Sequence, residues 1–150
     1  MSVYNEAESL QTLITLLGEV EGTRVTLIGD VMLDRYHHGY ANNLNSTAPV
    51  PALRVLYSEE SPGAAAHIAR GLSSLGLSVD LHSSVGDDNE GKSIIRTLSE
   101  DGIDTSGIIE VEGRNTLTKI RFYGSRENLL EQEQILLQAD RGPLDDLDPS

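Results

Sequence analysis

The chain has no cysteine, no tryptophan and a single phenylalanine among its 150 residues. The absence of cysteine excludes disulfide bonds and metal sites built from thiolates. With so few large aromatic side chains, the hydrophobic core must be mainly aliphatic. No segment approaches the run of about 18 apolar residues that crosses a membrane, and the N-terminus lacks the basic and then apolar pattern of a secretion signal. These absences predict a cytoplasmic protein.

Basic residues are scarce as well. The net charge is −13, from 24 acids against 11 bases, and only Lys92 and Lys119 are lysines. This balance repels nucleic acids and anionic lipids, so we expect neither a nucleic acid nor a membrane as a partner. The plain interpretation of the excess acid is a solubilising surface. A phosphate-binding site would need some of the few bases to be concentrated locally.

The apolar pattern alternates between helix and strand periods along the chain. It predicts, in order, a helix over 5–20, a buried strand over 24–30, short extended pieces near 36–40 and 52–58, a helix after Pro62 that ends at Gly76, a strand over 79–86, a helix over 89–102, strands over 107–113 and 116–124 joined by a turn, and a strand over 134–140. This alternation argues for an α/β sheet with crossover helices. Only two or three parallel strands are assured, so the chain looks like the front half of a larger unit.

Two carboxylates follow the first strand in the stretch VTLIGDVMLDRY. Ligands of open α/β sheets bind beyond the carboxyl ends of the strands, and a carboxylate can accept hydrogen bonds from two sugar hydroxyls. For Asp30 alone, a cap on the following turn is the favoured interpretation. For Asp34 we favour a ligand, and the alternative is an ion pair with Arg35 or Arg54.

The segment SPGAAAH provides the second feature, because small residues over 63–66 would let a ligand approach the backbone at the start of a helix. The same residues could equally serve tight packing of the helix on a strand. In that helix, Ile68, Leu72 and Leu75 are expected to face inward.

Lys119 and Arg121 form the third feature, since two residues two positions apart on a strand share one face. In so acidic a chain, a paired basic face is a candidate phosphate site, and the alternative is a salt bridge to the acidic surface. The four histidines show no metal-ligand spacing, so no metal site is expected. The sequence contains no Walker loop and no dinucleotide GxGxxG motif.

The stretches GDVMLDRY, APVPALRV, SPGAAAHIARGLSSLG, VGDD and TLTKIRFYG occur in one order over about residues 22–140. This order resembles ribokinase-like carbohydrate kinases of the phosphofructokinase-B type, and within them the heptose-7-phosphate kinases that form the kinase part of ADP-heptose synthases. GDxxLDRY with a downstream APVP is fairly specific, whereas the glycine-alanine helix start and VGDD belong to the wider family.

The resemblance implies a ribokinase-like fold, with a parallel-sheet, Rossmann-type core and a small β-stranded lid over about 36–58. It implies that Asp34 grips sugar hydroxyls, that Gly63 contacts the sugar, and that Lys119, with Arg121 beside it, binds a phosphate on the substrate. The lid in many members clasps a second subunit, so a homodimer through the lid is expected.

The sequence departs from the family pattern at two positions of the sugar-contact motif. The second glycine of the sugar-contact motif is Ala64, and the asparagine expected three residues later is His67. An added methyl group narrows the approach to the backbone, and an imidazole cannot reproduce the paired donor and acceptor of an amide. Both positions remain candidate substrate-binding residues.

The family's catalytic base and its ATP site lie in a second half that these 150 residues do not reach. We therefore expect no catalytic residue here, no activity from these residues alone, and ATP with Mg²⁺ bound elsewhere in the complete protein. One hypothesis is thus the N-terminal half of a sugar-phosphate kinase, an enzyme that transfers a phosphoryl group to an alcohol. The other is a non-catalytic module that binds a sugar phosphate or dimerises.

Overall fold

The computed structural model describes residues 6–125 and 133–143. Its three helices and seven strands are, in chain order, α1 (Glu6–Val20), β1 (Arg24–Ile28), β2 (Val31–Leu44), β3 (Pro51–Ala64), α2 (Ala65–Ser74), β4 (Ser78–Gly86), α3 (Asn89–Glu100), β5 (Ile108–Val111), β6 (Thr118–Ser125) and β7 (Gln134–Arg141). The predicted alternation of helices and strands is confirmed.

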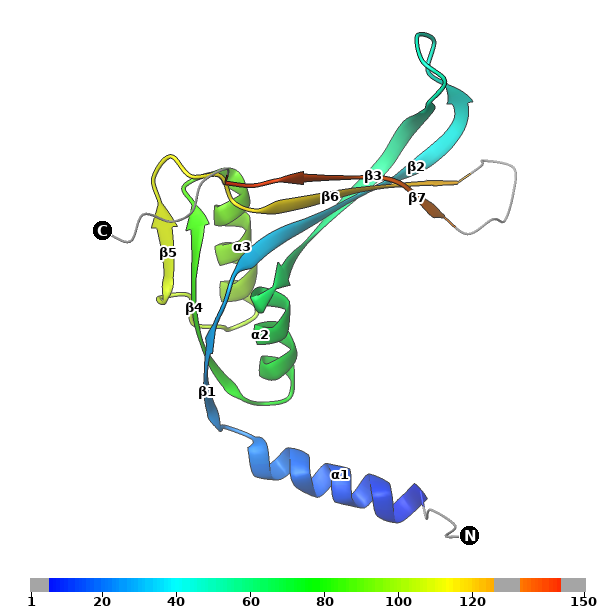
Figure 1. The fold of residues 1–150 in the computed structure, drawn as a ribbon. Helices are drawn as coiled ribbons and strands as arrows, with labels where there is room; N and C mark the ends of the chain where they lie inside the picture. The colour runs from blue at the N-terminus through cyan, green and yellow to red at the C-terminus, as the bar shows by residue number, and fades with distance from the viewer. Residues whose placement is uncertain (1–5, 126–132, 144–150) are drawn as a thin grey trace.

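The strands form two sheets (Figure 1). The first is a parallel sheet in the order β1-β4-β5. The second has the order β3-β2-β6-β7, in which β2 and β6 run parallel and the two outer pairs run antiparallel. Figure 1 shows this second sheet projecting away from the three-stranded sheet and from helices α2 and α3. The extended segment expected over 36–58 therefore belongs to a projecting sheet.

One expectation about these strands was wrong. β2 and β3 are continuous strands of 14 residues each, where the sequence suggested short extended pieces. Helix α2 begins at Ala65, after Pro62 as expected, because β3 continues through Pro62 and Gly63. β5 and β6 are two strands joined by a turn, as expected, and this turn passes from one sheet to the other.

Helix α2 packs through a face made of alanine. Ala65, Ala66 and Ala69 are buried, whereas Ile68 and Leu75, both expected inside, are about half exposed. Helix α2 lies close to the link between β1 and β2. A Cβ atom added to Gly29 in this link would come within 3.2 Å of the Ala65 Cβ atom. Only small side chains fit at that distance, whereas Leu72, also expected inside, is partly buried and packs against the core.

The core itself is aliphatic, as the composition requires. Its largest fully buried apolar side chains come from β2, β4 and α3, and they are Leu33, Leu81, Val85, Ile94 and Leu98. The first residues of β2 thus belong to the core, and the rest of the strand lies in the projecting part of the sheet.

Two apolar surfaces remain uncovered in the part of the chain that the structure describes. β1 was expected to be buried, but its residues alternate between exposed and half-buried, and Ile28 is 79% exposed. Helix α1 carries its apolar residues on one face as predicted, yet Leu13, Ile14 and Leu17 are largely exposed because α1 extends away from the sheets (Figure 1). Among the described residues no helix is long and apolar enough to cross a membrane.

Asp88 connects three segments at the end of β4. Its carboxylate caps α3 by accepting a hydrogen bond from the Gly91 N–H at 2.9 Å. It also accepts hydrogen bonds from the Thr116 hydroxyl at 2.6 Å and the Thr116 N–H at 2.9 Å, and the same hydroxyl accepts one from the Gly86 N–H. The loop before β6 is thereby fixed to the end of β4.

The pKa of Asp88 reflects this environment. Burial by itself would raise it, but the hydrogen bonds from Thr116 and Gly91 and the attraction of Arg141 outweigh burial. The net result is a pKa below the ordinary value of an aspartate. The folded chain therefore favours the ionised form of this carboxyl group.

Asp88→Ala should lower the free energy of unfolding at pH 7 by about 2 kcal/mol, because it removes a helix cap and leaves the buried Thr116 without its acceptor. Since the pKa of Asp88 is lower in the folded than in the unfolded chain, this stabilisation is complete above about pH 4 and is lost as the pH falls through the folded-state pKa. Urea denaturation of the wild type and the variant should therefore converge in acid.

The matched control is Asn89→Ala, a change at the exposed neighbouring position, which should alter stability by less than about 0.5 kcal/mol. A loss from Asp88→Ala that is no larger than the control, or that persists unchanged in acid, would contradict the role of Asp88 as a clamp.

Candidate functional site

The candidate residues meet at the base of the projecting sheet. In the register of the strands, Asp34 on β2 lies opposite Ser61 on β3 and Lys119 on β6. Arg121 follows two residues later on β6, opposite Tyr36. Residues in register point to the same face of a sheet, so Asp34, Lys119 and Arg121 share one face, as predicted for the two bases.

Asp34 forms an ion pair with Arg121, whose Nη1 lies 2.6 Å from the Asp34 Oδ1. Neither arginine that was expected as the alternative partner is used. Arg35 points to the other side of the sheet, where it pairs with Glu60 at 2.6 Å and Glu90 at 3.2 Å. The hydrogen bond to Asp34 raises the pKa of Arg121 although burial opposes it. Asp34 is thus a fixed carboxylate with one oxygen already engaged.

Tyr36 is a site residue that the sequence reasoning missed. The Arg121 guanidinium carbon lies 5.4 Å from the centroid of the Tyr36 ring, within the range of a cation–π interaction. The signal was present in the motif LDRY, because Tyr36 stands two residues after Asp34 on the same strand face. The tyrosine helps to hold the arginine that in turn holds Asp34.

Gly63 lies directly against Asp34. A Cβ atom at position 63 would collide with the Oδ2 atom of Asp34, so this position requires glycine for close approach. Oδ2 is the carboxylate oxygen that Arg121 does not contact through a hydrogen bond. The free oxygen and the bare backbone of Gly63 therefore lie side by side.

Ala64 has an unusual backbone conformation, with φ 52° and ψ −125° at the junction of β3 and α2. Positive φ values are common for glycine and strained for alanine. The following N–H, that of Ala65, donates a hydrogen bond to the Asp30 carbonyl at 3.0 Å. Position 64 thus has a backbone conformation that glycine favours, although an alanine stands there in place of the glycine of the family pattern.

Lys119 and His67 differ from the others in their surroundings. Lys119 is half-buried, and its side chain makes no hydrogen bond or ion pair within residues 6–125 and 133–143, although Asp34 and Asp140 flank it in the register. His67 is exposed on α2, and its side chain makes no hydrogen bond or ion pair with the described residues. The structure therefore brings Asp34, Gly63, Lys119 and Arg121 together, whereas no hydrogen bond or ion pair among the described residues joins His67 to them.

The expected cap at Asp30 is absent. Its carboxylate makes no hydrogen bond in the described part of the chain, and it lines a pocket at the carboxyl ends of β1 and β4. Among the same residues, no three metal-binding side chains lie close enough together to hold a metal ion.

Comparison with known proteins connects this geometry to a family. The family model of the pfkB family carbohydrate kinases matches residues 23–137. The bifunctional protein HldE of Magnetococcus marinus is 37% identical over 116 residues, which cover 77% of this chain and 24% of that protein. The D-beta-D-heptose 7-phosphate kinase of Bordetella bronchiseptica is 41% identical over 107 residues, which cover 71% and 34%. The chain thus spans about a quarter to a third of the length of these relatives.

Solved structures give the same fold. A nucleoside kinase of Methanocaldococcus jannaschii, an archaeal member of the ribokinase family, matches with a TM-score of 0.58 and 22% identity over 81% of this chain and 37% of that one. A sugar kinase of Pyrococcus horikoshii in complex with ATP matches with a TM-score of 0.52 and 25% identity over 79% and 34%. The ribokinase-like fold expected from the sequence is confirmed. The chain belongs to the pfkB family of carbohydrate kinases.

Proposed function

We propose that this chain supplies the sugar-binding and lid portion of an ATP-dependent kinase that phosphorylates a sugar phosphate such as a heptose 7-phosphate. The observation that carries the proposal is the Asp34 carboxylate, which Arg121 fixes through one oxygen and which presents the other beside Gly63. The similarity to a heptose 7-phosphate kinase supports the choice of substrate class.

Asp34 would accept hydrogen bonds from the hydroxyl groups of the sugar. A carboxylate oxygen accepts hydroxyl hydrogen bonds strongly when its orientation is fixed in advance, and the ion pair with Arg121 provides this fixation. Because Gly63 carries no side chain, a sugar ring can approach both the carboxylate and the backbone. Ala64 narrows the same approach by one methyl group.

Lys119 would bind the phosphate that the substrate already carries. The charge of Arg121 is balanced by Asp34, whereas Lys119 has no ion-pair partner in the described residues. An ammonium group that is half-buried and unpaired offers a phosphate a point charge without first breaking a salt bridge. Lys119 is therefore the better phosphate ligand of the two bases.

The phosphoryl donor would be ATP with Mg²⁺. The first N–H of α2, that of Ala65, is already bonded to the Asp30 carbonyl, so this helix start does not offer that N–H to a phosphate. We propose that the nucleotide site and the catalytic base lie outside these residues, and that these residues alone are inactive. A cytoplasmic location fits a substrate and donor of this kind.

A second candidate function is a non-catalytic dimerisation module. It is favoured by the apolar side chains that the projecting sheet exposes at both of its edges, which are Val55, Leu56 and Tyr57 on β3 and Ile135, Leu136 and Leu137 on β7. An ATP-dependent kinase assay of the complete protein, with a heptose 7-phosphate as acceptor, distinguishes the two functions. A complete protein that binds the sugar phosphate but never transfers phosphate would favour the module.

Asp34→Asn in the complete kinase should raise the KM for the sugar about 10- to 100-fold, since each hydrogen bond to a carboxylate contributes about 1.5–3 kcal/mol. The amide keeps the shape of the side chain but weakens the acceptor. Glu59→Gln is the matched control, because Glu59 lies on the same face of the sheet, opposite Tyr36 and farther from Gly63. The measurement is steady-state kinetics of both variants. An equal rise in the KM for the sugar in Asp34→Asn and Glu59→Gln would contradict the assignment of Asp34.

Lys119→Met in the complete kinase should raise the KM for a sugar phosphate at least tenfold while leaving the KM for the unphosphorylated sugar nearly unchanged. The reason is that the ammonium group would contact only the phosphate. The measurement is a comparison of the two substrates at fixed ATP concentration. Equal losses with both substrates would show that Lys119 has a structural role.

We also propose that the protein is a homodimer joined through the projecting sheets, because a sheet this thin cannot bury both of its faces alone. Light scattering across a range of protein concentrations should report a dimer. Added salt should strengthen it by screening the net charge of −13. A well-folded monomer at every concentration would contradict this assembly.

A further inference from the structure

Glu90 is a buried carboxylate on the core-facing side of helix α3. It shares this helix face with Ile94 and Leu98, which follow at four and eight residues and are fully buried. The helical period would favour an apolar residue at position 90, because the burial of a carboxylate is unfavourable unless the charge is paired. A glutamate at this position therefore requires compensating contacts.

Two arginines of the projecting sheet provide these contacts. Arg35 on β2 donates a hydrogen bond from Nη2 to the Glu90 Oε1 at 3.2 Å. Arg141 on β7 donates one from Nη1 to the same oxygen at 3.4 Å. One carboxylate oxygen of α3 thus connects two strands of the sheet at a common point.

Both arginines lie next to a proposed substrate ligand. Arg35 follows Asp34 directly on β2, and Arg141 lies opposite Thr118, the residue before Lys119 on β6. Side chains alternate between the two faces along a strand. Asp34 and Lys119 therefore point to one face of the sheet, while the two arginines are held beneath them on the other.

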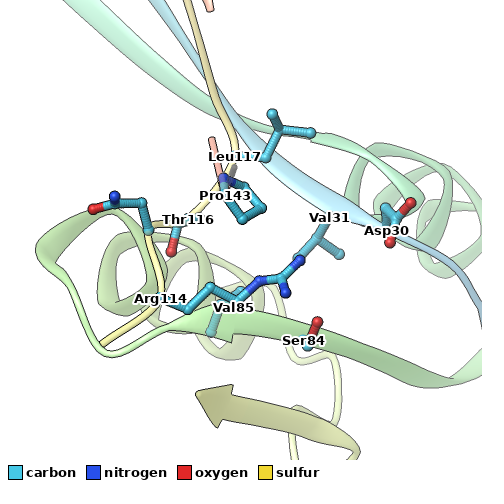
Figure 2. Close-up of a pocket in the computed structure, with 9 residues that line it drawn as sticks. Asp30, Val31, Ser84, Val85, Arg114, Thr116, Leu117 and Pro143 are labelled. Carbon is cyan, nitrogen blue, oxygen red and sulfur yellow. The ribbon is translucent and has the colours of Figure 1, made fainter. Parts of the chain in front are cut away.

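The start of α3 is itself fixed to the core. Asp88 caps the helix and accepts hydrogen bonds from Thr116 in the loop before β6. Figure 2 shows Pro143, two residues after Arg141, beside Leu117 of the same loop, and both line one pocket. The carboxylate that receives the two arginines is therefore attached to a fixed part of the fold.

We propose that Glu90 is a positioning residue for the kinase reaction. It acts through Arg35 and Arg141, and it sets where Asp34 and Lys119 stand relative to the core. The inference rests on the proposed function, in which these two residues bind the sugar and its phosphate. A displacement of about 1 Å in a binding group is enough to weaken catalysis strongly, so loss of this tie should impair substrate binding without removing any substrate contact.

The test is steady-state kinetics of Glu90→Gln in the complete kinase, because glutamine keeps the shape of the side chain but removes the charge that holds both arginines. The KM for the sugar phosphate should rise about five- to twentyfold. The KM for ATP should stay unchanged, since the nucleotide site is proposed to lie outside these residues. A merely structural role would instead reduce the folded fraction and the apparent kcat while leaving both KM values unchanged.

Glu100→Gln is the matched control, since Glu100 is exposed at the end of the same helix and the change in charge is identical. It should leave both KM values unchanged. Glu90→Gln should also raise the KM by a smaller factor in an Asp34→Asn background than in the wild type, because residues that act through one another are not additive.

A second variant keeps the test available if circular dichroism shows that Glu90→Gln does not fold. Arg141→Met removes one half-exposed partner of Glu90, and it should raise the KM for the sugar phosphate in the same way by a smaller factor. Its control is Arg96→Met, at an exposed position of α3 that makes no ion pair in the described residues.

An equal KM for the sugar phosphate in Glu90→Gln and Glu100→Gln, or full additivity with Asp34→Asn, would overturn the positioning role. This result would leave the proposed function standing if Asp34→Asn and Lys119→Met have their expected effects. If those two variants leave the KM for the sugar phosphate unchanged, the proposed function is wrong, and the inference fails with it.

Discussion

The carboxylate of Asp88 fixes the loop that leads into β6. Through its bonds to Gly91 and Thr116 it joins the end of β4, the start of α3 and this loop. β6 carries Lys119 and Arg121. A half-buried carboxylate that accepts several hydrogen bonds is costly to disrupt, so one side chain fixes the starting point of the strand from which these two bases project.

A second set of charges connects the projecting sheet to the helix beneath it. Glu90, which is only 9% exposed, lies near the N-terminus of α3 and accepts hydrogen bonds from Arg35 on β2 and Arg141 on β7. Arg35 also pairs with Glu60 on β3. β2 and β7 are therefore bonded to Glu90 directly, and β3 is connected to it through Arg35. In a chain with few bases, two of them are used to orient the sheet, and Lys119 is left without an ion-pair partner among the described residues near the candidate site.

The order and type of the elements could be predicted from the sequence, because apolar periodicity is a local property. The alanine face of α2 could not, since the spacing of Ile68, Leu72 and Leu75 is equally compatible with an inward face until the distance to Gly29 is known. The partner of Asp34 could not be predicted either. Arg121 is 87 residues away and reaches Asp34 only because β2 and β6 pair in parallel.

The basic pair on β6 was recognisable because two-residue spacing on a strand is visible in the sequence. Resemblance to the family identified Asp34 and Gly63 as candidate site residues, and the collision that a Cβ atom at 63 would cause gives the physical reason for glycine there.

The conformation of Ala64 has a consequence for ligand binding. A non-glycine residue at φ 52° and ψ −125° costs about 1–3 kcal/mol and persists only where its surroundings enforce it. The pairing of β3 with β2 and the packing of α2 provide that enforcement. Since Gly63 adjoins this residue, the backbone beside Asp34 is then shaped by contacts made elsewhere, and a ligand that rests on it would stabilise the junction as it binds.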